Sequence, residues 1–582
     1  MSAIDKWNLE SLFKNQNDLD GFVKRLQTKA VSFEKKYSGK LSNIVDFEVV
    51  IGEYENLLEG IGRIMTYAFL IFAKDSSNGA YYSKYELIAN KIQDSLIFFE
   101  IELTNLDSKI INKAIKSSKK YKYFLQKLVE QKKHLLSKEE EKILLKVSPV
   151  GKEAFSRLFD EYMSSLKFKF DGKIVSEEEI LSKLHFDNRV TRKAAQKELT
   201  KRLRKSSHIL KYIINIVRKD LRIKMDLRGY EKPESFRHID NQISQKSVDS
   251  MIDIVVKNFP LVHKYYKIKS KILGIEKLKD YDRYAPINIG SKEATFPYEK
   301  AKTMVIESYM DFSVKFGKIV QDAFKNGWVD SHPAKNKRSG AFSHGATPIA
   351  HPYVLLNHTD GRRCVFTIAH EFGHAIHQEL SKSVGYLNMD TPLTTAETAS
   401  VFGEMLLFDK MKKELKGDQL LSLYAGKIED IFSTLFRQVV MTNFEREIHK
   451  RDGELEVSDL NEIWFDENKK MFEDTLFLSD NYKLWWSYIP HFIHSPFYCY
   501  AYGYGQLLSL TLFGLYKSGS KDFVKKYTEF LSCGGSKSPS ELVGIFGFDI
   551  EDDKFWKYGI DEVKKILDEF NKIAKDVINK RD

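Results

Sequence analysis

The sequence predicts a mainly α-helical protein with one small β-sheet, and three observations support this fold class. The 582 residues include only 12 Pro and 31 Gly, so few residues interrupt helices. Apolar residues recur at i, i+3, i+4 and i+7 over most of the chain. The 40 Phe, 29 Tyr and 6 Trp supply enough apolar surface for large cores, and a chain of this length needs more than one. Disordered, collagen-like and low-complexity classes are excluded.

The first half of the chain carries the helical period almost without interruption. Residues 1–110 are predicted to be helical, most clearly in the run IVDFEVVIGEYENLLEGIGRIMTYAFLIFAK. Residues 111–185 continue as helices, with a break at Ser148-Pro149 and a short polar turn at Asp171-Gly172. The period persists over 190–275 and gives way to a loop over 280–286.

The pattern changes after a further predicted helix over 298–326. Three short strand-like runs follow at 328–329, 340–342 and 353–356, separated by Gly, Pro and Ser. Beyond Asp360-Gly361 the chain returns to helix until its end. A small sheet inserted in a helical body indicates a site built where sheet and helix meet.

Cysteine use and apolar runs predict the compartment. The three cysteines, Cys364, Cys499 and Cys533, form no CxxC pair, which excludes a disulfide scaffold and a Cys-based zinc finger and favours a reducing cytoplasm. The N-terminal segment contains Asp5 and Glu10 and lacks the apolar core of a signal peptide. The longest uncharged stretch, 495–516, contains Pro, Gly, Gln and several Tyr, and we expect it to be protein interior rather than a membrane span.

The net charge of +11 is concentrated in two windows. Residues 111–150 contain 11 Lys against 4 Glu, and residues 192–224 contain 12 Lys or Arg against 2 acids. Such windows permit nucleic-acid binding. No nucleic-acid-binding motif accompanies them, so solvated helix faces are the favoured interpretation and no nucleic-acid partner is expected.

The segment FTIAHEFGHAIHQEL contains an HExxH motif at 370–374. On a helix His370 and His374 lie on one face, so both imidazoles can reach one metal ion. Two imidazoles and a carboxylate suit Zn²⁺ and leave one position for water, whose pKa the metal lowers. Glu371 can then act as the general base that takes the proton of this water as it attacks a carbonyl.

A third ligand is available in TPLTTAETASVFGEMLLF. Glu397 would face an apolar stripe, and a buried carboxylate without a partner is costly, so a metal is its predicted partner. Glu404, seven residues later on the same face, either accepts the N–H of a ligand imidazole or is a solvated helix residue. His377 shares the face of the motif histidines and is either a polar residue at the edge of a cleft or a substrate contact.

The segment HFIHSPFYCYAYGY, 491–504, combines histidines and phenols in an uncharged setting. Such groups can donate hydrogen bonds to a developing oxyanion, although aromatic residues at helical spacing are usually core. His491, Tyr498 and Tyr502 are the preferred candidates, ahead of Tyr500 and Tyr504. His494 stays open.

Together these segments resemble oligoendopeptidase F, of the thimet-oligopeptidase-like zinc metallopeptidases, over nearly the whole chain. The matching segments, in family order, are WNL at the start, RGY and DNQIS, LGIEKLKDYDRYAPI, GAFSHG, HPYVLLN, FTIAHEFGHAIH, AETASVFGEM and HFIHSPFYCYAYGYG. Each is weak alone, apart from the HExxH helix, and their order makes the resemblance specific.

The resemblance implies a fold and site roles. The fold would be two helical lobes around a deep substrate channel with zinc on its floor, divided as an N-terminal helical region 1–110, an oligoendopeptidase N-terminal domain 111–185 and a catalytic domain 190–582. Zinc ligands would fall on His370, His374 and Glu397, and the base on Glu371. The transition-state donors would fall within 491–504, with an uncertain offset.

The expected activity is therefore that of a cytoplasmic endopeptidase with one Zn²⁺ per chain, acting on short peptides that are its only expected partners. An edge strand at 353–356 would pair with the substrate backbone, and the sequence preference would be broad. The alternatives are an exopeptidase of the HExxH-plus-Glu type, either an aminopeptidase or a carboxypeptidase, and a non-catalytic helical binding protein. No membrane association is expected, and the oligomeric state is not predicted.

Overall fold

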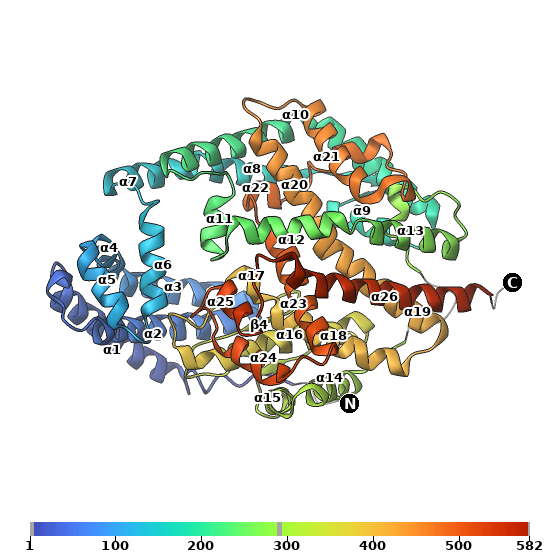
Figure 1. The fold of residues 1–582 in the computed structure, drawn as a ribbon. Helices are drawn as coiled ribbons and strands as arrows, with labels where there is room; N and C mark the ends of the chain where they lie inside the picture. The colour runs from blue at the N-terminus through green and yellow to red at the C-terminus, as the bar shows by residue number, and fades with distance from the viewer. Residues whose placement is uncertain (1–4, 288–293, 580–582) are drawn as a thin grey trace. The chain divides into compact units, whose positions relative to one another are not determined.

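The structure is a computed structural model that describes residues 5–287 and 294–579 (Figure 1). The chain forms two compact units, each assembled from three separate segments. The first unit contains 1–133, 294–413 and 515–549, and the second contains 134–293, 414–514 and 550–582. The prediction of a mainly helical fold with a small sheet is confirmed. The division into three consecutive domains stays a prediction.

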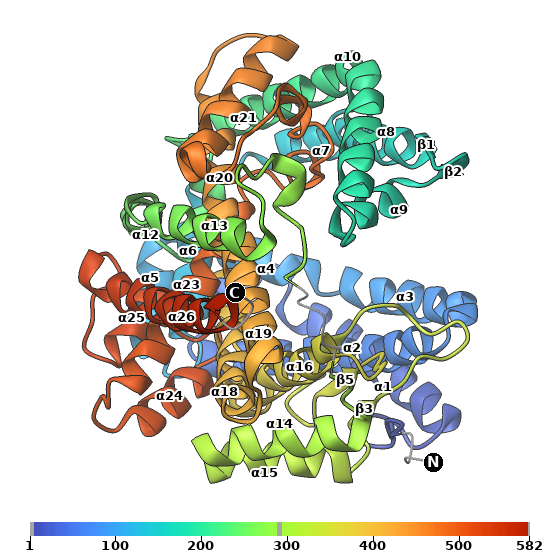
Figure 2. The ribbon, with the colours of Figure 1, turned by 90° about the vertical axis from the view of Figure 1, so that its right-hand side faces the viewer.

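The first unit is helical apart from one three-stranded sheet (Figure 2). Its elements are α1 (Gln16–Tyr37), α2 (Phe47–Lys74), α3 (Gly79–Asp94), α4 (Ile97–Asn105), α5 (Ser108–Ser117), α6 (Lys122–Lys132), α14 (Tyr298–Phe312), α15 (Val314–Lys325), β3 (Val329–Asp330), β4 (Phe342–His344), β5 (Tyr353–Leu355), α16 (Arg362–Ser381), α17 (Leu393–Ala396), α18 (Thr398–Glu414), α24 (Phe523–Ser532) and α25 (Pro539–Gly544).

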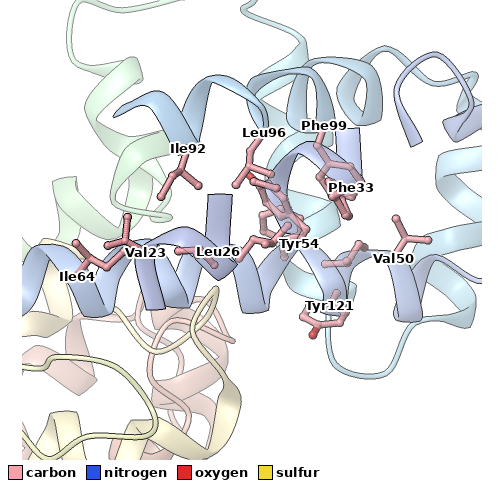
Figure 3. Close-up of a cluster of buried hydrophobic side chains, with 14 of the residues drawn as sticks. Val23, Leu26, Phe33, Val50, Tyr54, Ile64, Ile92, Leu96, Phe99 and Tyr121 are labelled. Carbon is pink, nitrogen blue, oxygen red and sulfur yellow. The ribbon is translucent and has the colours of Figure 1, made fainter. Parts of the chain in front are cut away.

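The core of the N-terminal helices explains why α1 and α2 pack together. The Asp46 side chain caps α2 by accepting the backbone N–H groups of Glu48 and Val49. The apolar face of α2 then meets buried residues of α1, α3, α4 and α6. Figure 3 shows this cluster, which includes Val23, Leu26, Phe33, Val50, Tyr54, Ile64, Ile92, Leu96, Phe99 and Tyr121.

Among the described helices, α2 is long and apolar enough to cross a membrane by length and composition alone. Such a helix is also what the core of a large helical protein requires. Val50, Tyr54 and Ile64 of α2 lie in the core of the first unit, and α2 packs against α1 and α3. This packing buries 39% of the most apolar window of α2. The stretch 495–516 lies largely in α23 and is mostly buried, as the sequence predicts.

The sheet of the first unit has the strand order β3-β5-β4. β5 runs parallel to β3, with Val329 opposite Val354, and antiparallel to β4, with Ser343 opposite Val354. The three predicted strands are confirmed to within two residues, but the prediction that the 353–356 strand is an edge is wrong. Tyr353, Val354 and Leu355 are all buried, as a continuous apolar run in a central strand should be. Over the described residues, the outer edge of β4 pairs with no other strand.

The second unit is also helical, with one small hairpin. Its elements are α7 (Lys138–Val147), α8 (Lys152–Ser165), β1 (Phe168–Phe170), β2 (Lys173–Val175), α9 (Glu177–Ser182), α10 (Arg189–Leu227), α11 (Ser235–Asp240), α12 (Gln245–Lys257), α13 (Pro260–Leu273), α19 (Gly417–Ile431), a π-helical turn (Phe432–Phe436), α20 (Arg437–Lys450), α21 (Val457–Phe472), α22 (His491–His494), α23 (Cys499–Lys517) and α26 (Asp553–Asn579). The long helix α26 packs against α12, α13 and α19 (Figure 1).

Two local predictions need correction. The turn at Asp171-Gly172 joins the strands β1 and β2 rather than two helices, and both turn residues have positive φ (50° and 73°). Asp-Gly between alternating apolar residues is the usual signal for such a hairpin. The single helix predicted over 298–326 is two helices, because the extended Ser313 (φ −156°, ψ 123°) separates α14 from α15.

Candidate active site

Helix α16 carries the HExxH residues. Its apolar face fixes the rotation of the helix, because that face is buried in the first unit. The buried residues around the motif are Val365, Ile368, Ala369, Phe372, Ala375 and Ile376. The histidines, four residues apart, project from the remaining side, where the side chains of His370 and His374 are 28% and 20% exposed.

Glu397 completes a cluster of three potential metal ligands with these histidines. The Nε2 atoms of His370 and His374 lie 3.2 Å apart, and Oε2 of Glu397 lies 3.4 Å from each. A tetrahedral ion with bonds of about 2.0–2.1 Å has ligand atoms about 3.3–3.4 Å apart. The three atoms are therefore spaced like corners of a tetrahedron around a zinc-sized ion, so the donor set fits Zn²⁺.

Two glycines bring the elements of this cluster together. A Cβ on Gly373 would lie 2.3 Å from the carbonyl oxygen of Ala399 and 2.4 Å from Cα of Ser400, so α16 meets the backbone of α18 there. A Cβ on Gly403 would lie 2.9 Å from the carbonyl oxygen of Ala369. Glu397 directly precedes α18, so this close contact of the two helices sets its distance from the histidines.

Glu404 orients one of the imidazoles. His370 donates its Nδ1–H to Oε1 of Glu404 over 2.7 Å, which leaves Nε2 directed at Glu397 and His374. A carboxylate in this position fixes the tautomer of a ligand histidine and makes it a better ligand. Of the two sequence interpretations of Glu404, the geometry matches the acceptor role.

The charges of the cluster are strongly coupled. Burial alone would lower the pKa of His370, but the hydrogen bond and charge of Glu404, together with Glu397 and Glu371, raise it to about 9. Burial alone would raise the pKa of Glu397, but the histidines hold it at about 2. The two carboxylates, Glu404 and Glu397, stabilise positive charge at this position. A bound cation would replace the proton on His370, because a metal-ligating imidazole must be neutral.

Glu371 lies beside the three potential ligands but outside their set. The residue is 7% exposed, and burial raises the pKa of its carboxyl group, against the lowering effect of the neighbouring His370 and His374. The backbone of Ser343 on β4 hydrogen-bonds to the carboxylate. A carboxylate with a raised pKa is a better proton acceptor near neutral pH than an exposed glutamate.

The histidine and tyrosine residues 491–504 belong to the second unit. Within it, the structure brings together His491, Tyr498 and Tyr502. Nε2 of His491 lies 3.4 Å from the Tyr502 hydroxyl, and the two tyrosine rings meet edge to face at 4.9 Å. All three are partly exposed, and burial together with the positive charge of Arg437 lowers the pKa of His491.

The other candidates have structural partners or are buried. Tyr500 is buried and its hydroxyl bonds to His238 and Asn241, while the buried Tyr504 hydroxyl bonds to Ser247. Nε2 of His494 lies 2.8 Å from Asp160 in the second unit. His377 is 5% exposed, and burial lowers its pKa to about 3, so it is an uncharged interior residue.

Sequence reasoning missed residues that position the candidates. Gln378 on α16 holds Ser343 of β4 by accepting from its hydroxyl (2.7 Å) and donating to its carbonyl oxygen (3.1 Å). Glu445 on α20 is fully buried and accepts the backbone N–H of Phe497. Phe497 directly precedes Tyr498 and has a positive φ of 57°. The available signal for Glu445 was an acidic residue on the apolar face of a helix.

Comparison with known proteins gives two matching family models. One, described as peptidase family M3, matches residues 182–562, and the other, described as oligopeptidase F, matches residues 102–168. The oligoendopeptidase F homolog of Borreliella burgdorferi is 29% identical, over 97% of this chain and 98% of that protein. The oligopeptidase PepF of Bacillus subtilis is 26% identical, over 97% and 88%.

Solved structures share the fold. A Chlamydophila abortus protein described as a peptidase superposes with a TM-score of 0.87 at 24% identity, over 98% of both chains. Oligoendopeptidase F of Enterococcus faecium gives a TM-score of 0.68 at 21% identity, over 96% of this chain and 99% of that one. Metallocarboxypeptidase 1 of Trypanosoma cruzi gives 0.52 at 14%, over 93% and 99%. Since the M3 model spans more than half of the sequence, this protein belongs to peptidase family M3 and is a metallopeptidase, a hydrolase of peptide bonds.

Proposed function

We propose that this metallopeptidase is a zinc-dependent endopeptidase that cleaves internal bonds of short oligopeptides. The observation that carries the proposal is the spacing of 3.2–3.4 Å among the ligand atoms of His370, His374 and Glu397, with Glu371 beside them. Cobalt or manganese can use similar ligands, so the metal itself must be measured.

The chemistry follows from the placement of the side chains. Zn²⁺ held by the three ligands would polarise the scissile carbonyl and lower the pKa of a water molecule. Glu371 takes a proton from that water as its oxygen attacks the carbonyl carbon, and later gives the proton to the departing amine. The hydrogen bond from His370 to Glu404 holds the imidazole in place throughout.

The substrate backbone pairs with β4 rather than with β5. β5 is buried between two strands, while over the described residues no strand pairs with the outer edge of β4. At Ser343 the backbone of β4 hydrogen-bonds to the side chains of Glu371 and Gln378. A peptide added as a strand at this edge makes main-chain hydrogen bonds next to the general base. Because main-chain bonding reads no side chains, a broad sequence preference follows.

His491, Tyr498 and Tyr502 are the proposed donors to the developing oxyanion, on the basis of the family resemblance and their exposed grouping within the second unit. Short peptides are the proposed partners. A cytoplasmic location is supported by three free cysteines, Cys364, Cys499 and Cys533.

Endopeptidase action is supported by the names of the relatives, but the fold is shared with a protein named as a carboxypeptidase. Internally quenched peptides blocked at both ends separate the alternatives. We expect the purified chain to cleave them, to contain one zinc, to lose activity with a chelator and to regain it with Zn²⁺.

The variant Glu371→Gln should keep its zinc and fold and lose turnover by orders of magnitude. Cleavage restricted to peptides with a free end would establish an exopeptidase. A chain with no zinc and no hydrolysis would be the non-catalytic binding protein. Near wild-type turnover by Glu371→Gln would refute the proposed role of the base.

A further inference from the structure

A groove of about 510 Å³ lies in the first unit along the strand that we propose to bind substrate. One wall is the segment 343–346, which includes the end of β4. Met65 and Phe69 from α2 and Tyr82 from α3 contribute apolar surface. The rest of the lining is Gly62, Thr66, Gln378, Tyr386 and Asp390. The groove therefore combines three aromatic side chains with polar groups, among them one carboxylate.

Asp390 has no partner of its own in this groove. Asp390 is exposed, and over the described residues no hydrogen bond or ion pair reaches its carboxylate. Its charge also contributes to raising the pKa of the Tyr386 hydroxyl, after the larger effect of burial. None of the described residues that line the groove is Lys or Arg, and burial lowers the pKa of His344 to about 4, so this imidazole is neutral.

The walls of the groove are held in place. Gly62 lets the Tyr386 hydroxyl come so close to α2 that a Cβ would lie 2.1 Å from it. Gln378, one helical turn after His374, fixes Ser343 through two hydrogen bonds. The same Ser343 contacts Glu371 through its backbone. The groove is thus continuous with the strand that contacts the general base.

A peptide paired with the edge of β4 directs alternate side chains to opposite faces. Side chains on one face would enter the groove close to the scissile bond. Lys and Arg can lay their aliphatic stems along apolar walls while the charged end reaches a polar group. The ring of Tyr82 can also attract such a cation, whereas the guanidinium of Arg338 already lies 5.6 Å from the ring centroid of Phe69.

We propose that this groove binds a Lys or Arg side chain of the substrate, with Asp390 as the counter-ion. The inference rests on the proposed endopeptidase function and adds a substrate class to it. Main-chain pairing makes the preference broad, and the groove favours basic peptides within that range.

The test uses matched quenched peptides in which one position at a time, on either side of the cleaved bond, is Lys, norleucine or Glu. In the wild type we expect kcat/KM for Lys to exceed that for norleucine at one position, with Glu lowest. Asp390→Asn should reduce the Lys-to-norleucine ratio about 5-fold, the effect of a partly exposed ion pair. Asp390→Lys should reverse the preference in favour of Glu.

Asp322→Asn, at an exposed acid on α15, is the matched control and should leave the ratio unchanged. Binding of the Lys peptide to the zinc-loaded Glu371→Gln protein, measured by calorimetry, should weaken by the same factor when Asp390→Asn is added. A ratio that Asp390→Asn does not alter, with cleavage intact, overturns this inference alone. No cleavage of any peptide by the zinc-loaded wild type overturns the proposed function, and this inference with it.

Discussion

Replacing Gly373 by Ala tests whether the contact between α16 and α18 builds the metal site. The added Cβ would lie 2.3 Å from the carbonyl oxygen of Ala399 and 2.4 Å from Cα of Ser400. Both are backbone atoms, so no side-chain rotation can relieve the overlap. Ordinary contact begins at 3.4 Å, and the helices must therefore separate by about 1 Å.

Such a shift would exceed what a metal site tolerates. Ligand distances must hold to within about 0.2 Å, and Glu397 lies two residues before Ala399. In the Gly373→Ala variant, Zn²⁺ can bind only if α16 and α18 come back together, which creates overpacking strain of about 1–3 kcal/mol. The affinity for Zn²⁺ should then fall about 5- to 150-fold.

The assay is competition with a chromophoric zinc chelator, together with the increase in Tm that Zn²⁺ produces. Gly544→Ala is the control, because its added Cβ would meet no neighbouring part of the protein within 4 Å. We expect the control to match the wild type in both measurements. If Gly373→Ala binds Zn²⁺ as tightly as the wild type, the close helix contact does not determine the position of Glu397.

Three further predictions concern the surroundings of the site. Glu404→Ala removes the acceptor of the His370 N–H and should weaken zinc binding about 10- to 100-fold in the same competition assay. Tyr502→Phe should lower kcat by about 10²-fold or more with unchanged zinc content, whereas Tyr500→Phe should affect mainly the Tm. Burial raises the pKa of Glu445 to about 8, so its contribution to stability is complete below pH 4.5 and is lost as the pH rises through 8. Glu445→Gln should therefore flatten the decrease in Tm between pH 5 and pH 8, and an unchanged decrease would contradict this assignment.

The elements that sequence reasoning located best are those with a strong local pattern. The HExxH helix combines an apolar face with two histidines four residues apart, so its period alone predicts which side chains share a face. Glu397 could be identified because a carboxylate beside an apolar stripe requires a partner. Strand positions followed from short β-favouring runs between Gly and Pro.

Strand order was less accessible because it depends on partners distant in sequence, and the hairpin was missed because its strands are short. The sequence of 353–356 does not indicate which strands lie on its two sides, β3 and β4 in the structure. Three consecutive buried apolar residues do favour a central strand. The hairpin at Asp171-Gly172 is held by β1 and β2 pairs of only three residues, too short for a period of two to stand out. The assembly of each unit from three segments has no local signature at all.

The proposed metal site has a strong local sequence pattern, whereas the proposed substrate groove depends on residues distant in sequence. The proposed metal ligands are a few residue types at a fixed spacing, and their chemistry is so restrictive that few arrangements satisfy it. The groove combines aromatic and polar side chains with one carboxylate, and these come from α2, α3, the end of β4, α16 and the segment before α17. Asp390 is an ordinary acidic residue in the sequence, and only its position among Phe69, Tyr82 and Tyr386 gives it a role. The proposed specificity therefore depends on tertiary placement, while the proposed catalytic chemistry follows from residues that the motif already contains.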